Sequence, residues 1–113
     1  MKEIKAILHP HMVEKVIHAL RRIKPFPGVT LVEARGQGRG AGPEQSFAMT
    51  EDDIDLHDKV LLIVVCREEL VDGIVETISR AARTGRRGDG IILVSEAAEV
   101  IRIRSGERDD SAV

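Results

Sequence analysis

The sequence predicts an α+β domain in which helices cover one face of an antiparallel sheet. Apolar patterns follow one another in the order strand, helix, strand, strand, helix, strand. The two halves also resemble each other, since IKAIL and HMVEKVI in the first half are matched by VLLIVV and EELVDGI in the second. A duplicated order of this kind predicts a ferredoxin-like βαββαβ sandwich, formed as a single domain by residues 1–113.

The first half contains a strand, a helix and a second strand. Alternating apolar residues predict a strand over residues 2–8. Pro10 ends this strand, and apolar residues at helical spacing then predict a helix over residues 12–23. A proline-rich stretch ends the helix, and residues 30–34 have the β-branched and apolar character of a second strand.

The second half repeats the pattern after a long polar loop over residues 36–58. The apolar segment 59–65 predicts a strand at the centre of the sheet, and segment 68–83 predicts the second helix. Two further short strands follow, the second of them over residues 100–104. The Val- and Ile-rich strands leave one sheet face without a helix, which other subunits would have to cover.

The long loop is glycine-rich where it begins and acidic where it ends. A loop of this length is uncommon in a compact domain and is usually either functional or disordered. Phe47 and Met49 are apolar residues in a polar segment, and they are candidate anchors for a partner. Asp52 and Asp53 belong to an acidic run that fits three interpretations: a solvated tip, a surface for a basic partner, or a site for a hard cation.

Composition excludes several classes of protein. The chain of 113 residues has two Phe and neither Tyr nor Trp, so its core must be aliphatic. A net charge of −2 gives no electrostatic case for nucleic acid. The single cysteine, Cys66, forms no internal disulfide, fits a reducing cytoplasm and suits a small buried apolar residue. The sequence shows neither a secretory leader nor an apolar run long enough for membrane insertion.

Two glycine-rich segments and one arginine-bearing strand predict an anion site. Glycines in GQGRG (residues 36–40) and in TGRRGDG (residues 84–90) let backbone N–H groups approach phosphate oxygens. On a strand over residues 100–104, Arg102 and Arg104 would share one face, and guanidinium forks suit phosphate. The alternative is an exposed edge strand whose arginines maintain solubility, together with a flexible loop entrance.

These segments resemble the signatures of the PII signal-transduction family. TGRRGDG and VIRIRSGERDDSAV are similar to the family's TGxxGDGK turn and RIRTGExDxxA ending, and GQGRGAG is similar to its GFGRQxG segment. The resemblance extends over essentially the whole chain. It implies a cytoplasmic homotrimer that is not an enzyme and that binds ATP or ADP in clefts between subunits, with magnesium as an optional companion. It also implies a role in nitrogen regulation, with signalling through the long loop to a membrane transporter or a metabolic enzyme.

The resemblance assigns a role to each candidate binding residue. The residues implied at the nucleotide phosphates come from separate strand ends and turns: Gly38, Arg39, Lys59, Gly88, Asp89, Gly90, Arg102 and Arg104. The residues implied at adenine and ribose are Ile7, Thr30, Gly36 and Val65. No nucleophile or base is recognisable among them, which favours a sensor over an enzyme.

Four positions depart from the family pattern. Asp52 stands where the family has the tyrosine that accepts a nucleotidyl group, so covalent control at that position is excluded. Gly40 replaces a glutamine that helps to hold magnesium and 2-oxoglutarate, which leaves binding of that acid open. Ile91 replaces a phosphate-binding lysine, and Ile63 replaces an acidic residue that reads adenine. The chain therefore resembles a divergent member of the family.

Two alternatives follow from other residues. His9 and His11, with His18 and His57, leave open a trimeric metal-binding or metal-responsive protein on the same fold. A weaker alternative is slow nucleotide hydrolysis at the phosphate site. The sequence leaves open the target, the preference among ATP, ADP and AMP, and the order of the long loop without ligand. The segment 105–113 is expected to be a tail that is solvated over residues 107–110.

Overall fold

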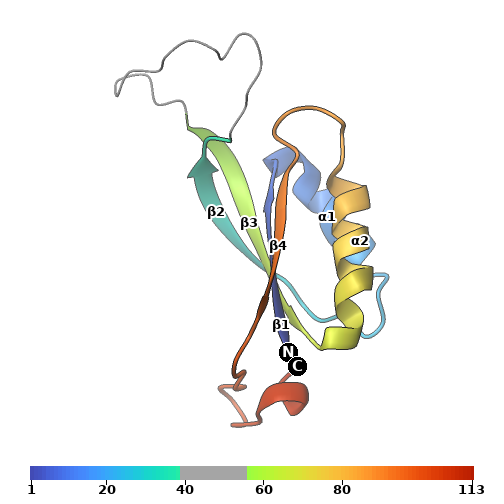
Figure 1. Ribbon diagram of the computed structural model, residues 1–113, viewed down its shortest axis with the longest axis vertical. Coiled ribbons are helices and arrows are strands. Elements are labelled where there is room, and N and C mark those ends of the chain that lie inside the picture. The colour runs from blue at the N-terminus through green and yellow to red at the C-terminus, as the bar shows by residue number, and fades with distance from the viewer. Residues whose placement is uncertain (39–55) are drawn as a thin grey trace.

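The computed structural model describes residues 1–38 and 56–113. Within these residues, one antiparallel sheet of four strands has two α-helices on one of its faces (Figure 1). The elements are β1 (Lys2–Leu8), α1 (Val13–Leu20), β2 (Thr30–Gly36), β3 (His57–Cys66), α2 (Val71–Ala82) and β4 (Gly90–Glu96). The strand order β2-β3-β1-β4 is that of the predicted ferredoxin-like fold, which is therefore confirmed.

The core lies between the sheet and the two helices. Ile4, Ala6 and Leu8 alternate along β1 and are fully buried, because every second side chain of the central strand points to the helices. The other residues of this aliphatic core come from β3, α1 and α2: Leu62, Val64, Cys66, Val16, Leu20, Ile74, Ile78, Ala81 and Ala82. Each fully buried leucine or isoleucine contributes roughly 1.5–3 kcal/mol to folding.

The predicted element boundaries were wrong by a few residues. Each α-helix begins with a short 3₁₀ turn, Pro10–Met12 before α1 and Glu68–Leu70 before α2. Helix α1 ends at Leu20. Strands β2 and β3 pair as far as Gly36 and His57, so the predicted loop over residues 36–58 begins and ends inside the sheet. Neither α-helix of the described chain is long and apolar enough to cross a bilayer.

The predicted strand over residues 100–104 is wrong. Ile101 forms an isolated bridge with Arg108, and residues 103–105 are a turn. The segment turns back on itself because Gly106, at φ +73°, closes the turn and none of the described strands lies beside it. Arg102 and Arg104 therefore do not share the face of a strand. The tail is exposed over residues 107–110 as predicted, although Asp109–Ser111 forms a 3₁₀ turn and Ala112 beyond it is buried.

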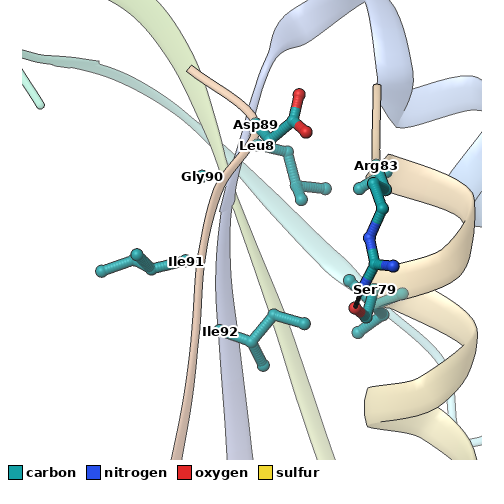
Figure 2. A pocket seen from close by; sticks show the side chains of 9 residues that line it. Leu8, Ser79, Arg83, Asp89, Gly90, Ile91 and Ile92 are labelled. Atoms are coloured by element: carbon teal, nitrogen blue, oxygen red, sulfur yellow. Dashed lines mark hydrogen bonds between the residues drawn. The ribbon is translucent and has the colours of Figure 1, made fainter. Parts of the chain in front are cut away.

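The sheet face opposite the helices is largely apolar, with the Lys5–Glu3 ion pair and Lys59 also on it, and no described element of the chain covers it. Figure 2 shows Ile92 of β4 pointing towards α2, whereas the adjacent Ile91 points away from it. Ile91 is 59% exposed. By strand register, the apolar side chains of this open face are Ile7, Val32, Leu61, Ile63, Val65, Ile91 and Leu93. An apolar face of this extent is typical of a protein–protein contact.

Candidate functional site

Lys59 and two glycine-bearing segments meet at one end of the sheet, which we name the loop end. The Lys59 Nζ atom donates to the carbonyl oxygen of Gly88 at 3.4 Å, so β3 and the turn before β4 are in contact. A Cβ atom at Gly36 would lie 3.9 Å from Lys59 Cγ. The exposed Gly38 follows β2 at the same end. An ammonium beside glycine backbone is a suitable surface for phosphate oxygens.

Gly90, the first residue of β4, can only be glycine in this fold. Its φ is +106°, and a Cβ atom there would lie 1.7 Å from the carbonyl oxygen of Ile7. Gly90 pairs with Leu8, so the backbone at the end of the turn before β4 lies directly against the backbone at the end of β1. This close approach fixes the position of the glycine turn relative to the strands that carry Ile7 and Lys59.

Asp89 organises the turn from Thr84 to Asp89. Its carboxylate accepts hydrogen bonds from the Thr84 N–H at 2.9 Å, from the Gly85 N–H at 3.0 Å and from the Thr84 hydroxyl. These bonds, led by the one from the Thr84 hydroxyl, lower the pKa of Asp89. The Thr84 hydroxyl in turn accepts the Arg86 N–H at 3.1 Å. The role of Asp89 here is to shape the turn that presents Gly88 and Gly90.

The remaining candidates lie towards the other end of the sheet, which we name the terminal end because both chain termini are there (Figure 1). Thr30 begins β2 and pairs with Ile63, two residues before Val65. Arg102 and Arg104 are exposed on a hairpin formed by residues 100–109, which we name the arginine hairpin. Figure 1 shows this hairpin at the opposite end of the longest axis from the loop end.

One chain therefore does not bring its candidate residues together. Six residues separate Lys59 from Val65 along β3, as they do Gly36 from Thr30 along β2. At the rise of an extended strand, each separation is about 20 Å. The loop end holds Ile7, Gly36, Gly38, Lys59, Gly88, Asp89 and Gly90, and the terminal end holds Thr30, Val65, Arg102 and Arg104. A ligand that contacts both groups needs two copies of the chain.

Several predicted site residues lie outside the described residues. They are Arg39 and the four candidate partner-binding residues of the loop, Phe47, Met49, Asp52 and Asp53. The structure describes only residues 36–38 and 56–58 of the predicted loop over residues 36–58. The last described residues before the gap are Gln37 and Gly38.

Two cavities lie near the loop end. One, of about 580 Å³, adjoins Lys59 and is lined by residues of β2, β3 and the first 3₁₀ turn: Pro10, Glu33, Ala34, Arg35, Asp58, Lys59 and Val60. The other, of about 230 Å³, lies between α2 and β4, with apolar walls and with Arg83 and Asp89 beside it (Figure 2). The larger cavity carries both signs of charge, and Arg35 lies 4.0 Å from Asp58 across it.

The histidines do not form a metal centre in the described part of the chain. His9 and His11 stack with ring centroids 5.0 Å apart, and the His9 Nδ1 atom accepts the His11 N–H at 3.2 Å. Among residues 1–38 and 56–113, no three His, Cys, Asp or Glu side chains gather closely enough to hold a metal ion. The metal-binding alternative gains no support from this geometry.

Comparison with known proteins identifies the family. The family model described as nitrogen regulatory protein P-II matches residues 1–107. The chain belongs to the P-II family. It is 41% identical over 113 residues to nitrogen regulatory protein P-II of Klebsiella oxytoca, with both chains covered in full. It is also 41% identical to P-II 1 of Escherichia coli K12 over the full length of both chains, and 43% identical to P-II 2 of Methanothermobacter thermautotrophicus, over all of this chain and 97% of that protein.

Sequence reasoning missed two parts of this P-II chain. The hydrogen bonds of Asp89 to its own turn have a local signal, because aspartate side chains commonly accept hydrogen bonds from nearby backbone N–H groups in turns. Arg67, which donates to the carbonyl oxygen of Asp110 at 2.9 Å, has no such signal. The partners are 43 residues apart in the sequence, and only the folded chain brings them together.

Proposed function

We propose that this chain is a regulatory protein that binds ATP or ADP between copies of itself, and that is not an enzyme. The observation that carries the proposal is the division of the candidate residues between the two ends of one sheet. Lys59 and the glycine turn supply one half of a phosphate site, and Arg102 and Arg104 supply the other. The cations and backbone N–H groups complement a ligand with several negative charges.

The open sheet face supports a homotrimer as the assembly that joins the two halves. Its apolar residues extend across all four described strands. A head-to-tail arrangement around a threefold axis closes into a ring and brings the loop end of each copy to the terminal end of the next. Each of the three clefts would then have a lysine from one copy and two arginines from its neighbour.

Signalling in this proposal passes through the segment between β2 and β3. Both flanks of that segment lie at the loop end, beside Lys59 and Gly36, so a nucleotide bound there contacts the residues from which the segment begins and ends. The ligand shifts the segment only by the difference in its affinity for the two states. The protein acts in the cytoplasm, and its target is a membrane transporter or a metabolic enzyme. No tyrosine is present to accept a nucleotidyl group.

Titration calorimetry tests the proposal. The full chain is titrated with ATP, ADP and AMP in the presence of magnesium, with and without 2-oxoglutarate. We expect binding of an adenine nucleotide, and an affinity lowered at least about tenfold in both Lys59→Ala and Arg104→Ala, since each removes a phosphate cation. A response to 2-oxoglutarate would place the protein with nitrogen sensing despite Gly40.

The matched control is Arg80→Ala. Arg80 is an exposed arginine on α2 that pairs with Glu76 at 2.6 Å and belongs to neither group of candidate residues. Its removal changes the net charge as the two test variants do and should leave the affinity unchanged. If wild-type protein binds none of the three nucleotides, or if Arg80→Ala weakens binding as much as Lys59→Ala does, the proposal is wrong.

A further inference from the structure

The arginine hairpin is a folded unit that its own backbone holds together. The Arg102 N–H donates to the Glu107 carbonyl at 2.8 Å, and the Asp109 N–H donates to the Val100 carbonyl at 2.8 Å. A third bond, from the Gly106 N–H to the Arg102 carbonyl at 2.7 Å, closes the turn. The hairpin tip, with its two arginines, therefore moves as one piece.

The hairpin is joined to the sheet at both of its ends. On one side the chain runs on from β4, and the Ala97 N–H donates to the Met1 carbonyl at 3.1 Å. On the other side Arg67, which lies between β3 and the turn that begins α2, donates from Nη2 to the Asp110 carbonyl at 2.9 Å. Ala112, two residues further on, is 6% exposed and anchors the end of the chain.

We propose that Arg67 is a positioning residue for Arg102 and Arg104. By holding the carbonyl of Asp110, it fixes the angle between the arginine hairpin and the sheet, and thereby the direction in which the two guanidiniums project. This inference rests on the proposed function, because it assigns a role towards the same nucleotide. The inference adds Arg67, which acts by holding the chain just after the hairpin and not by contact with the nucleotide.

The size of the effect follows from the geometry. A hydrogen bond from a guanidinium to a carbonyl contributes more than a neutral one, but both partners here are exposed, which reduces its net value. Without it, the hairpin is correctly oriented for only part of the time, and the apparent dissociation constant rises as that fraction falls. We expect Arg67→Ala to bind nucleotide about 3- to 10-fold more weakly.

The test combines calorimetry with hydrogen exchange on the full-length protein. ADP is titrated into the wild type, Arg67→Ala, Arg67→Lys and the control Arg80→Ala. Amide exchange is measured by mass spectrometry on the same proteins without nucleotide. We expect Arg67→Ala to lose protection in peptides that cover residues 97–113, with peptides from β1 and β3 unchanged. Arg67→Lys, which keeps a cationic donor, should recover part of both the protection and the affinity.

Each result has a distinct meaning. Unchanged ADP affinity and unchanged exchange in Arg67→Ala would overturn the positioning role and leave the proposed function intact. Faster exchange throughout β1 and β3 would overturn it as well, because the loss would then be one of general stability. If the wild type binds none of ATP, ADP and AMP, the proposed function itself fails, whereas the exchange data still report whether Arg67 orders the hairpin.

Discussion

Replacing Gly90 with alanine should destabilise the protein more than any other single methyl addition at its described glycines. The added Cβ atom would lie 1.7 Å from the Ile7 carbonyl oxygen and 2.9 Å from the Ile7 carbonyl carbon, both of them backbone atoms. The backbone at φ +106° adds strain of about 1–3 kcal/mol for a residue with a side chain. Separating the paired ends of β1 and β4 to relieve the clash costs about 1–3 kcal/mol more.

The expected loss for Gly90→Ala is therefore about 2–6 kcal/mol in the free energy of unfolding. Urea denaturation followed by circular dichroism measures it, at one fixed protein concentration because assembly contributes to stability. The matched control is Gly73→Ala in α2, where an added Cβ atom meets nothing within 4 Å. Alanine should stabilise that helix by about 0.5–1 kcal/mol. A loss below about 1 kcal/mol for Gly90→Ala would refute the close approach of β4 to β1.

Three further predictions concern the turn, the open face and the cysteine. Hydrogen bonds, led by the one from the Thr84 hydroxyl, lower the pKa of Asp89 in the folded protein. The ionised carboxylate therefore stabilises the fold above the unfolded pKa of about 3.9, and this stabilisation is lost as the pH falls through the lower folded pKa. Asp89→Asn should therefore make the free energy of unfolding less dependent on pH below about pH 4, and an unchanged acid limb in urea titrations would contradict this. Leu93→Glu places a charge on the open face and should dissociate the assembly in sedimentation velocity. The control is Leu31→Glu on the helix side, which should leave the assembly intact although Leu31 is 43% exposed and Leu93 46%. An intact Leu93→Glu assembly would disprove the use of that face. Burial raises the pKa of the Cys66 thiol, so a thiol reagent at pH 8 should label Cys66 slowly in the folded protein and rapidly only in denaturant. Rapid labelling of the native chain would instead show that the core around β3 opens.

Most of the fold could be predicted from the sequence, because the core is periodic. The alternation of Ile4, Ala6 and Leu8 identified β1 with its correct bounds, and the internal duplication predicted the strand order. The element ends were less predictable, since the 3₁₀ turns before α1 and α2 contain the same residue types as the helices they precede.

The segment over residues 100–104 misled sequence reasoning for a physical reason. Its alternation of Ile with Arg is that of a strand, but a strand also needs a neighbour, and none of the described strands lies beside it. The residues of the candidate site were named one by one from the PII resemblance, and their contacts with nucleotide stay a prediction. Its division between the two ends of the sheet required the folded chain, because the sequence pattern placed Arg102 and Arg104 on a strand and did not show the hairpin that carries them.

Co-assembly of two defective chains tests the central claim most directly. Lys59→Ala removes the loop-end cation and Arg104→Ala removes a terminal-end cation, so each variant alone should bind ADP poorly. If the site forms between neighbouring copies, trimers refolded from an equal mixture should regain full affinity in about one quarter of their clefts, where an intact loop end meets an intact hairpin. Calorimetry should then report that fraction of strong sites. If the mixture binds no better than either variant alone, the site does not form between copies of the chain.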